Sequence, residues 1–129
     1  MRFMIIVKAS PESETGAMPS QARFDEMADY HAELARAGVL LDANGLQRSS
    51  LGWRIRYRGK ERSIVDGPFT ESKELIAGYT LISVRTREEA LEWARRYPNP
   101  RGAGLDTEIE VRQLFEPDDL IPSDAVAQH

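Results

Sequence analysis

The first strand that the sequence predicts is apolar on both faces, and this feature constrains the fold more than any other. Phe3 and Ile5 lie on one face of residues 2–9, and Met4 and Ile6 lie on the other. A strand of this kind is typical of the middle of a sheet that is covered on both sides. The chain must therefore supply two covering layers.

Length and composition fit a single domain. A chain of 129 residues with 41% hydrophobic residues can form one core. Its formal net charge of −4 is too small to indicate a partner, and the absence of cysteine excludes disulfides and thiolate chemistry. The apolar run from Phe3 to Val7 is too short for a signal peptide or a membrane span. We therefore expect a cytoplasmic protein that does not contact membranes.

Two helices are predicted. The first follows Ser20, a typical N-cap residue, and runs to about Ala37. The second follows Thr86, which forms a capping box with Glu89, and ends near Tyr97. The apolar spacing of the first helix predicts a buried face formed by Phe24, Met27, Ala28, His31, Leu34 and Ala35.

The segments between the helices predict strands and turns. Residues 39–41 form a short apolar segment, and residues 42–45 are expected to form a turn. Residues 10–19 are predicted to be a loop, which is either a functional lid or a mobile connection. Further strands are predicted at residues 53–57, 61–65, 77–85 and 108–115, and the first two of these form a hairpin.

The order of these elements predicts an α+β fold. It is the ferredoxin-like βαββαβ arrangement with an elaborated hairpin in its middle. Two helices can cover one face of the antiparallel sheet, while the other face would leave an apolar patch exposed in a monomer. We therefore expect a homodimer whose sheets pack face to face.

One run carries a resemblance to a known family. Residues 66–69 read Asp-Gly-Pro-Phe, and the wider run from Asp66 to Leu81, DGPFTESKELIAGYTL, resembles the signature of the YCII-related (DGPF-domain) family. The resemblance covers roughly residues 2–118 and implies a dimeric α+β barrel. It divides the chain into a YCII-related domain at 1–118 and a C-terminal tail at 119–129. Supporting segments are residues 38–41, 45–46, 88–93, 98–100 and 108–112.

The resemblance also indicates which residues to consider as catalytic. Relatives often carry histidine where this chain has Gln47 and Arg101, and small stand-alone members of the wider family are thought to use a His–Asp pair. In this chain His31 is the one histidine that is not at the C-terminus. The candidate catalytic residues are therefore Asp66, within the signature, and His31.

Each candidate has a structural alternative. Asp66 would act as a general base in a dry cleft, because burial raises the pKa of a carboxylate, or it caps the Gly67–Pro68 turn through backbone amides. His31 would exchange a proton near neutral pH, or it is a residue at the edge of the core that bonds a backbone carbonyl. The catalytic hypothesis requires the two side chains to meet across a cleft between helix and sheet.

Tyr79, Trp53 and Lys8 are the candidate ligand-binding residues. Aromatic side chains with polar tips are typical of small-molecule pockets, although core packing or a dimer interface explains Tyr79 and Trp53 equally well. No phosphate-binding loop or metal-ligand spacing is present, so we expect neither a cofactor nor a metal. A basic hairpin is interpreted as a solvated strand face rather than a nucleic-acid surface; it contains Arg54, Arg56, Arg58 and Arg62.

Two classes of function stay open. The first is a small homodimer that binds a small organic molecule in a helix–sheet cleft, with acid–base catalysis by Asp66 and His31. The second, which the resemblance implies, is a non-catalytic regulator or partner of an extracytoplasmic-function sigma factor, without direct contact to nucleic acid. A cavity with convergent polar groups favours the first class. A filled core with an exposed apolar groove favours the second.

Overall fold

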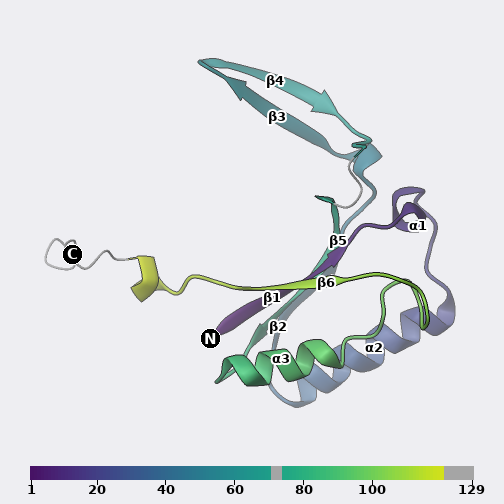
Figure 1. The fold of residues 1–129 in the computed structure, drawn as a ribbon, viewed down its shortest axis with the longest axis vertical. Helices are drawn as coiled ribbons and strands as arrows, with labels where there is room; N and C mark the ends of the chain where they lie inside the picture. The colour runs from purple at the N-terminus through teal and green to yellow at the C-terminus, as the bar shows by residue number, and fades with distance from the viewer. Residues whose placement is uncertain (71–73, 121–129) are drawn as a thin grey trace, which may run out of the picture.

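The computed structural model describes residues 1–70 and 74–120, which form an antiparallel sheet with helices on one side and a projecting hairpin (Figure 1). The main sheet has the strand order β2-β5-β1-β6 and every neighbouring pair is antiparallel. Its strands are β1 (Arg2–Lys8), β2 (Leu40–Gly45), β5 (Ile76–Ser83) and β6 (Ile109–Gln113).

Three α-helices and two single turns of 3-10 helix complete the described chain. The α-helices are α1 (Pro11–Glu14), α2 (Gln21–Arg36) and α3 (Arg87–Arg95), and the 3-10 helices are η1 (Ser49–Leu51) and η3 (Pro117–Leu120). The second sheet is a hairpin of β3 (Trp53–Arg58) and β4 (Glu61–Asp66). The α+β class is therefore confirmed, and the strand order is consistent with the ferredoxin-like arrangement.

The core lies between the main sheet and the two long helices, α2 and α3, which lie on the same side of it (Figure 1). Ile5 of β1 and Ile82 of β5 are fully buried against Leu34 of α2. Tyr30 is also buried, and its hydroxyl donates a 2.6 Å hydrogen bond to the carbonyl of Trp93, which ties α2 to α3. The central position predicted for the first strand is confirmed, because β1 pairs with both β5 and β6.

The opposite face of the sheet carries a second apolar set. Met4 pairs with Leu81, and Ile6 pairs with Tyr79, across the β1–β5 register. Side chains alternate along a strand, so these four point away from the face that α2 and α3 cover. All four are half-buried rather than buried. This is the face on which the sequence predicts a dimer.

The turn predicted at residues 42–45 is wrong, because these residues belong to β2. Asp42 pairs with Leu81 and Asn44 pairs with Tyr79, after a register shift between Leu40 and Asp42. A shift of this kind interrupts the alternation of apolar and polar residues by which a strand is recognised. The strand is also at the edge of the sheet, where polar residues are tolerated, and its sequence consequently resembles a turn.

Two further expectations need correction. The predicted loop at residues 10–19 contains α1, because Ser10 and Ser13 cap each other's backbone N–H groups with their hydroxyls. The predicted start of α2 after Ser20 is confirmed. The buried residues of this helix are Tyr30 and Leu34, and Tyr30 is not in the predicted buried face. Phe24 is 55% exposed and Ala35 is also exposed, since the first and last turns of α2 extend past the core.

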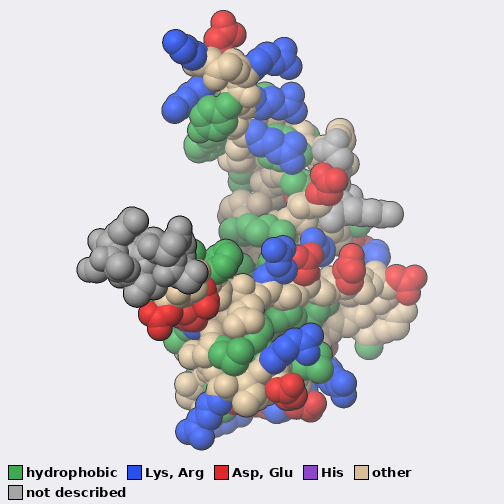
Figure 2. All heavy atoms as spheres, turned by 60° about the vertical axis from the view of Figure 1, so that its left-hand side comes forward, with side chains coloured by type: hydrophobic (Ala, Val, Ile, Leu, Met, Phe, Trp, Pro, Cys, Tyr) green, Lys and Arg blue, Asp and Glu red, His purple; other side chains and the backbone are tan. Residues whose placement is uncertain are grey.

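The β3–β4 hairpin projects from the body with Lys and Arg side chains gathered around its tip (Figure 2). The predicted hairpin is confirmed, and each strand begins at the predicted residue and runs one residue further. Its apolar side is exposed, with Trp53 64%, Tyr57 67% and Ile64 70% accessible. Arg54 lies 3.8 Å from the centre of the Phe69 ring, so part of the basic face packs on an aromatic side chain.

The C-terminal boundary falls inside η3, and residues 121–129 of the predicted tail lie outside the described residues. Within the described ranges, no helix combines the length and the apolar character needed to span a membrane.

Candidate functional site

The Asp-Gly-Pro-Phe signature lies where β4 returns to the body of the molecule. Asp66 ends β4 and is exposed, and among the described residues no hydrogen bond to its carboxylate is present. The turn is held by another residue: the Ser49 hydroxyl accepts the N–H of Phe69 at 3.1 Å. The N–H of Gly67 donates to the carbonyl of Gly52 at 3.0 Å.

Ser49 also connects the signature to α1. Its backbone N–H donates to the Glu14 carboxylate at 2.9 Å, and its hydroxyl donates to the same carboxylate. The fit at the signature is close, because a Cβ added to Gly67 would overlap the carbonyl oxygen of Ser49. The signature therefore contacts η1 at the end of β4 and is connected to α1 through Ser49.

A cleft of about 440 Å³ opens between α2 and the main sheet. We call it the helix–sheet cleft. Most of the residues that line it are apolar or have small side chains, as in typical small-molecule pockets. Its floor comes from the covered face of β5 and its sides come from α2, the end of β2 and the segment after α3. The residues that line the cleft include His31, Thr80, Tyr97, Arg23, Met27 and Ala28.

His31 and Arg23 are the polar residues of α2 that line this cleft. The Nε2 atom of His31 lies 2.8 Å from the Thr80 hydroxyl oxygen, which fixes the ring against β5. Thr80 is 1% exposed and is thus a buried hydroxyl whose partner is the imidazole. Among the described residues, the other ring nitrogen, Nδ1, has no hydrogen-bond partner.

Burial shifts the pKa values of His31 and Tyr97, two of the titratable residues that line the cleft. It lowers the pKa of His31 from its usual 6.5, because a partly dry environment disfavours the imidazolium. His31 is consequently neutral at pH 7 and can accept a proton. Burial also raises the pKa of Tyr97, an effect that the neighbouring Thr80 hydroxyl partly offsets. The cleft therefore holds a neutral base beside a neutral phenol.

Comparison with known proteins places the chain in a family. The model of the YCII-related domain matches residues 1–115. The chain belongs to the YCII-related family. This YCII-related protein is 30% identical over 112 residues to an uncharacterised protein of Rhizobium meliloti strain 1021, a match that covers 84% of this chain and 90% of the relative.

A solved structure is also similar to this YCII-related protein. It is a 5-chloro-2-hydroxyhydroquinone dehydrochlorinase from Burkholderia phenoliruptrix AC1100, solved in complex with 2,5-dihydroxybenzoquinone. The sequence identity is 18% and the TM-score is 0.46, with 92% of this chain and 97% of that chain covered. At these values the similarity says nothing about the activity of the present protein.

The structure does not bring the predicted catalytic residues of this YCII-related protein together. His31 lines the cleft and bonds Thr80, whereas Asp66 lies at the base of the hairpin, away from the lining of the helix–sheet cleft. Asp66 also lacks the burial that a role as general base requires, and its predicted capping of the turn is performed by Ser49 instead.

The predicted ligand-binding residues are likewise separated. Tyr79 borders the helix–sheet cleft, but its side chain points to the opposite face of the sheet, where its hydroxyl donates to Asp42 at 2.8 Å and accepts from Asn44 at 3.0 Å. Lys8 forms an ion pair with Glu110 at 3.2 Å, and Trp53 is exposed on the hairpin. Neither Lys8 nor Trp53 lines the cleft in this YCII-related protein.

The sequence alone does not single out Thr80 or Tyr97 in this YCII-related protein. The available signal is the hydroxyl of Thr80 on the covered face of an otherwise apolar strand, since a buried hydroxyl needs a partner. Tyr97 follows α3 and looks like ordinary core packing. Within residues 1–70 and 74–120, no group of three histidine, aspartate or glutamate side chains is placed to hold a metal ion.

Proposed function

We propose that this YCII-related protein is a homodimer that binds a small organic molecule in the helix–sheet cleft and exchanges a proton with it through His31. The observation that carries the proposal is the His31–Thr80 contact on the wall of an apolar cleft of about 440 Å³. Small-molecule sites typically occupy about 300–1,000 Å³ and combine apolar walls with a few fixed polar groups.

The proposed chemistry uses His31 without Asp66 of the same chain. A neutral imidazole held by Thr80 can take a proton from an acidic C–H or O–H group of a ligand and return it elsewhere. Tyr97 supplies a hydroxyl that can hydrogen bond the charge that develops on the ligand. The exposed position of Asp66 gives it no part in this proposal.

The proposed dimer is supported by the second apolar face of the sheet. Met4, Ile6 and Leu81 gather there at the centre of two neighbouring strands, and α2 and α3 lie on the other side. Covering such a face with a second copy removes apolar surface from water, which is the main favourable contribution in most protein association.

The cleft is tested by filling it. Ala28 is an exposed α2 residue on the cleft wall, so Ala28→Trp should block the cleft without removing a core contact. Ala35→Trp is the matched control, because Ala35 is exposed on the same helix and does not line the cleft. A library of small organic molecules is screened by thermal shift. We expect stabilising molecules for the wild type and Ala35→Trp, and none of these for Ala28→Trp.

An equal response of all three proteins would refute binding in this cleft. The proton-exchange step has its own test, because His31→Asn retains a side chain that can hydrogen bond Thr80 but cannot serve as a base. A stabilising molecule should still bind His31→Asn, while solvent exchange of its acidic proton, followed by NMR, should slow toward the rate without protein.

The alternative is a non-catalytic regulator or partner of an extracytoplasmic-function sigma factor. The exposed apolar side of the hairpin, with Trp53, Tyr57 and Ile64, favours it. In that case Trp53→Ser and Ile64→Ser should abolish a protein interaction that Ala28→Trp leaves intact. The cleft with its positioned imidazole favours the first proposal.

A further inference from the structure

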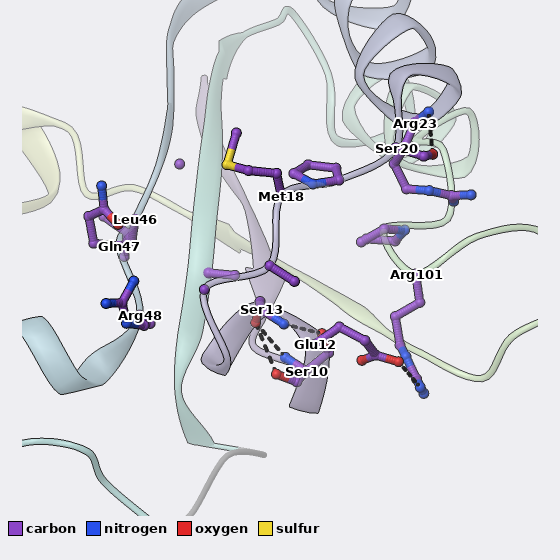
Figure 3. A pocket seen from close by; sticks show the side chains of 16 residues that line it. Ser10, Glu12, Ser13, Met18, Ser20, Arg23, Leu46, Gln47, Arg48 and Arg101 are labelled. Carbon is purple, nitrogen blue, oxygen red and sulfur yellow. Dashed lines mark hydrogen bonds and ion pairs between the residues drawn. The ribbon is translucent and has the colours of Figure 1, made fainter.

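A second cavity, of about 560 Å³, adjoins the helix–sheet cleft and is lined by three arginines (Figure 3). We call it the arginine cavity. Arg23 comes from the first turn of α2, Arg48 from the segment before η1, and Arg101 from the segment after α3. The two cavities adjoin directly, because they share part of their lining: Pro19, Arg23, Gly45, Ala77 and Pro100.

The arginine cavity has an excess of positive charge. Of the described residues that line it, Glu12 is the one acid, and it pairs with Arg101 at 2.8 Å. Hydrogen bonding by Arg101 lowers the pKa of Glu12 to about 2, so this pair stays ionised at neutral pH. Within the described residues, neither Arg23 nor Arg48 has an acidic side chain within 4.0 Å.

The guanidinium groups are positioned before any ligand arrives. Arg23 Nη1 donates to the carbonyl of Asn99 at 3.2 Å, and its guanidinium fits against Gly102, where a Cβ would lie 2.8 Å from Nη2. Arg48 Nε donates to the Ser50 hydroxyl at 3.0 Å. Positioned side chains lose less conformational entropy on binding, so the cavity is prepared for an anion.

One further observation agrees with an anionic occupant. Ser20, the N-cap of α2, also lines the cavity, and the positive end of the helix dipole adds to the field there. Arginine is well matched to carboxylates because its planar group can donate two parallel hydrogen bonds.

We propose that the ligand of this protein is a small organic acid whose carboxylate is bound by Arg23, where the arginine cavity meets the helix–sheet cleft, while its apolar body occupies the helix–sheet cleft beside His31. This inference rests on the proposed function, since it assumes that the cleft binds a small molecule. Arg23 joins the two parts of the site because it lines both cavities. Glu12 already neutralises one arginine, which favours a ligand with a single carboxylate over a multiply charged one.

The test compares acids with their uncharged amides. Benzoate, 3-phenylpropanoate, benzamide and 3-phenylpropanamide are titrated into the full chain by calorimetry, with inorganic phosphate as the probe for anion binding alone. We expect at least one acid to bind about tenfold or more tightly than its amide, which corresponds to one charge-assisted hydrogen bond. Arg23→Gln should remove most of that preference, and Arg48→Gln, on the other side of the arginine cavity (Figure 3), should reduce it less.

Two further variants distinguish the loss of a ligand contact from structural damage to the protein. Glu12→Gln should tighten binding of the acid, because it releases Arg101, whereas structural damage would weaken binding. Arg36→Gln is the matched control, since Arg36 is an exposed α2 residue that lines neither cavity. It should leave the affinity unchanged.

Three results would overturn the inference: acids and amides that bind equally well, an acid preference that survives Arg23→Gln, or phosphate binding without binding of any acid. If amides and acids bind equally and Ala28→Trp abolishes the binding of both, the helix–sheet cleft is a binding site but is not specific for acids. If no probe and no library molecule binds, the proposed function falls and the inference falls with it.

Discussion

His31 is the residue whose ionisation the fold changes in the most testable way. Its pKa is lowered in the folded protein by burial, while in the unfolded chain it titrates near 6.5. Below pH 6.5 the unfolded chain therefore binds more protons than the folded protein. The free energy of unfolding should be highest above this pH and should fall as the pH drops through it.

We predict that removing the imidazole weakens this pH dependence. Between about pH 8 and about pH 5 the wild type should lose more thermal stability than His31→Asn, whose amide does not titrate. The comparison is made by calorimetry in matched buffers. The glutamates with lowered pKa, Glu12, Glu110 and Glu116, start from 4.5 and affect stability at lower pH. Parallel curves for the two proteins would show that burial of His31 does not disfavour its charged form.

At the scale of residues, the sequence indicates candidates but not their surroundings. His31 stands out in the sequence because it lies in the apolar stripe of a helix, and it does line a cleft. Asp66 stands out because it lies in the family signature, yet it is exposed. Exposure depends on how the hairpin leaves the body, and a local pattern such as Asp-Gly-Pro-Phe carries no information about that direction.

At the scale of elements, the signature matters through the contact between Gly67 and η1. A side chain at Gly67 would overlap the Ser49 carbonyl, while a Cβ at Gly52 would lie at an ordinary 3.6 Å from the same oxygen. We predict that Gly67→Ala lowers the free energy of unfolding by about 2–3 kcal/mol, because backbone must move to admit the methyl group. Urea denaturation measures it.

Gly52→Ala is the matched control for Gly67→Ala. Its backbone φ of −109° suits alanine, so it should change stability by less than about 1 kcal/mol. Equal effects of the two substitutions would show that the close approach to Ser49 is not what demands glycine in the signature.

Most elements are predictable because their signals are local. Ser20 and Thr86 mark the starts of α2 and α3, and alternation marks β3 and β4. β2 escapes prediction because its register shift and its polar edge position hide the strand pattern. The predicted buried face of α2 is partly wrong. Tyr30 is buried, and its hydroxyl bonds the carbonyl of Trp93, whereas Phe24, which the spacing places on the buried face, is exposed.

At the scale of the whole molecule, the second face of the sheet is the proposed interface. Leu81 is half-buried at its centre, next to Met4. We predict that Leu81→Lys shifts the protein from dimer to monomer, because a charge would be buried without a partner. Leu91→Lys on α3, where Leu91 is 44% exposed, should leave the dimer intact. Sedimentation velocity distinguishes these results, and a monomeric wild type would refute the interface.

The cavities lie beyond what the sequence can show. His31, Thr80 and Tyr97 are far apart along the chain, and no spacing rule connects them. Arg23, Arg48 and Arg101 are equally dispersed along the sequence and line one cavity only because the segments that carry them surround it. An arginine in a sequence usually indicates a solvated surface, so this cluster becomes visible only in three dimensions.

The central claim is that the helix–sheet cleft binds a small molecule. Native mass spectrometry after incubation with a metabolite extract tests it most directly on the wild type, Ala28→Trp and Ala35→Trp. We predict a dimer that carries a defined extra mass for the wild type and Ala35→Trp, and a dimer without that mass for Ala28→Trp. The same extra mass on all three proteins, or on none of them, would contradict it.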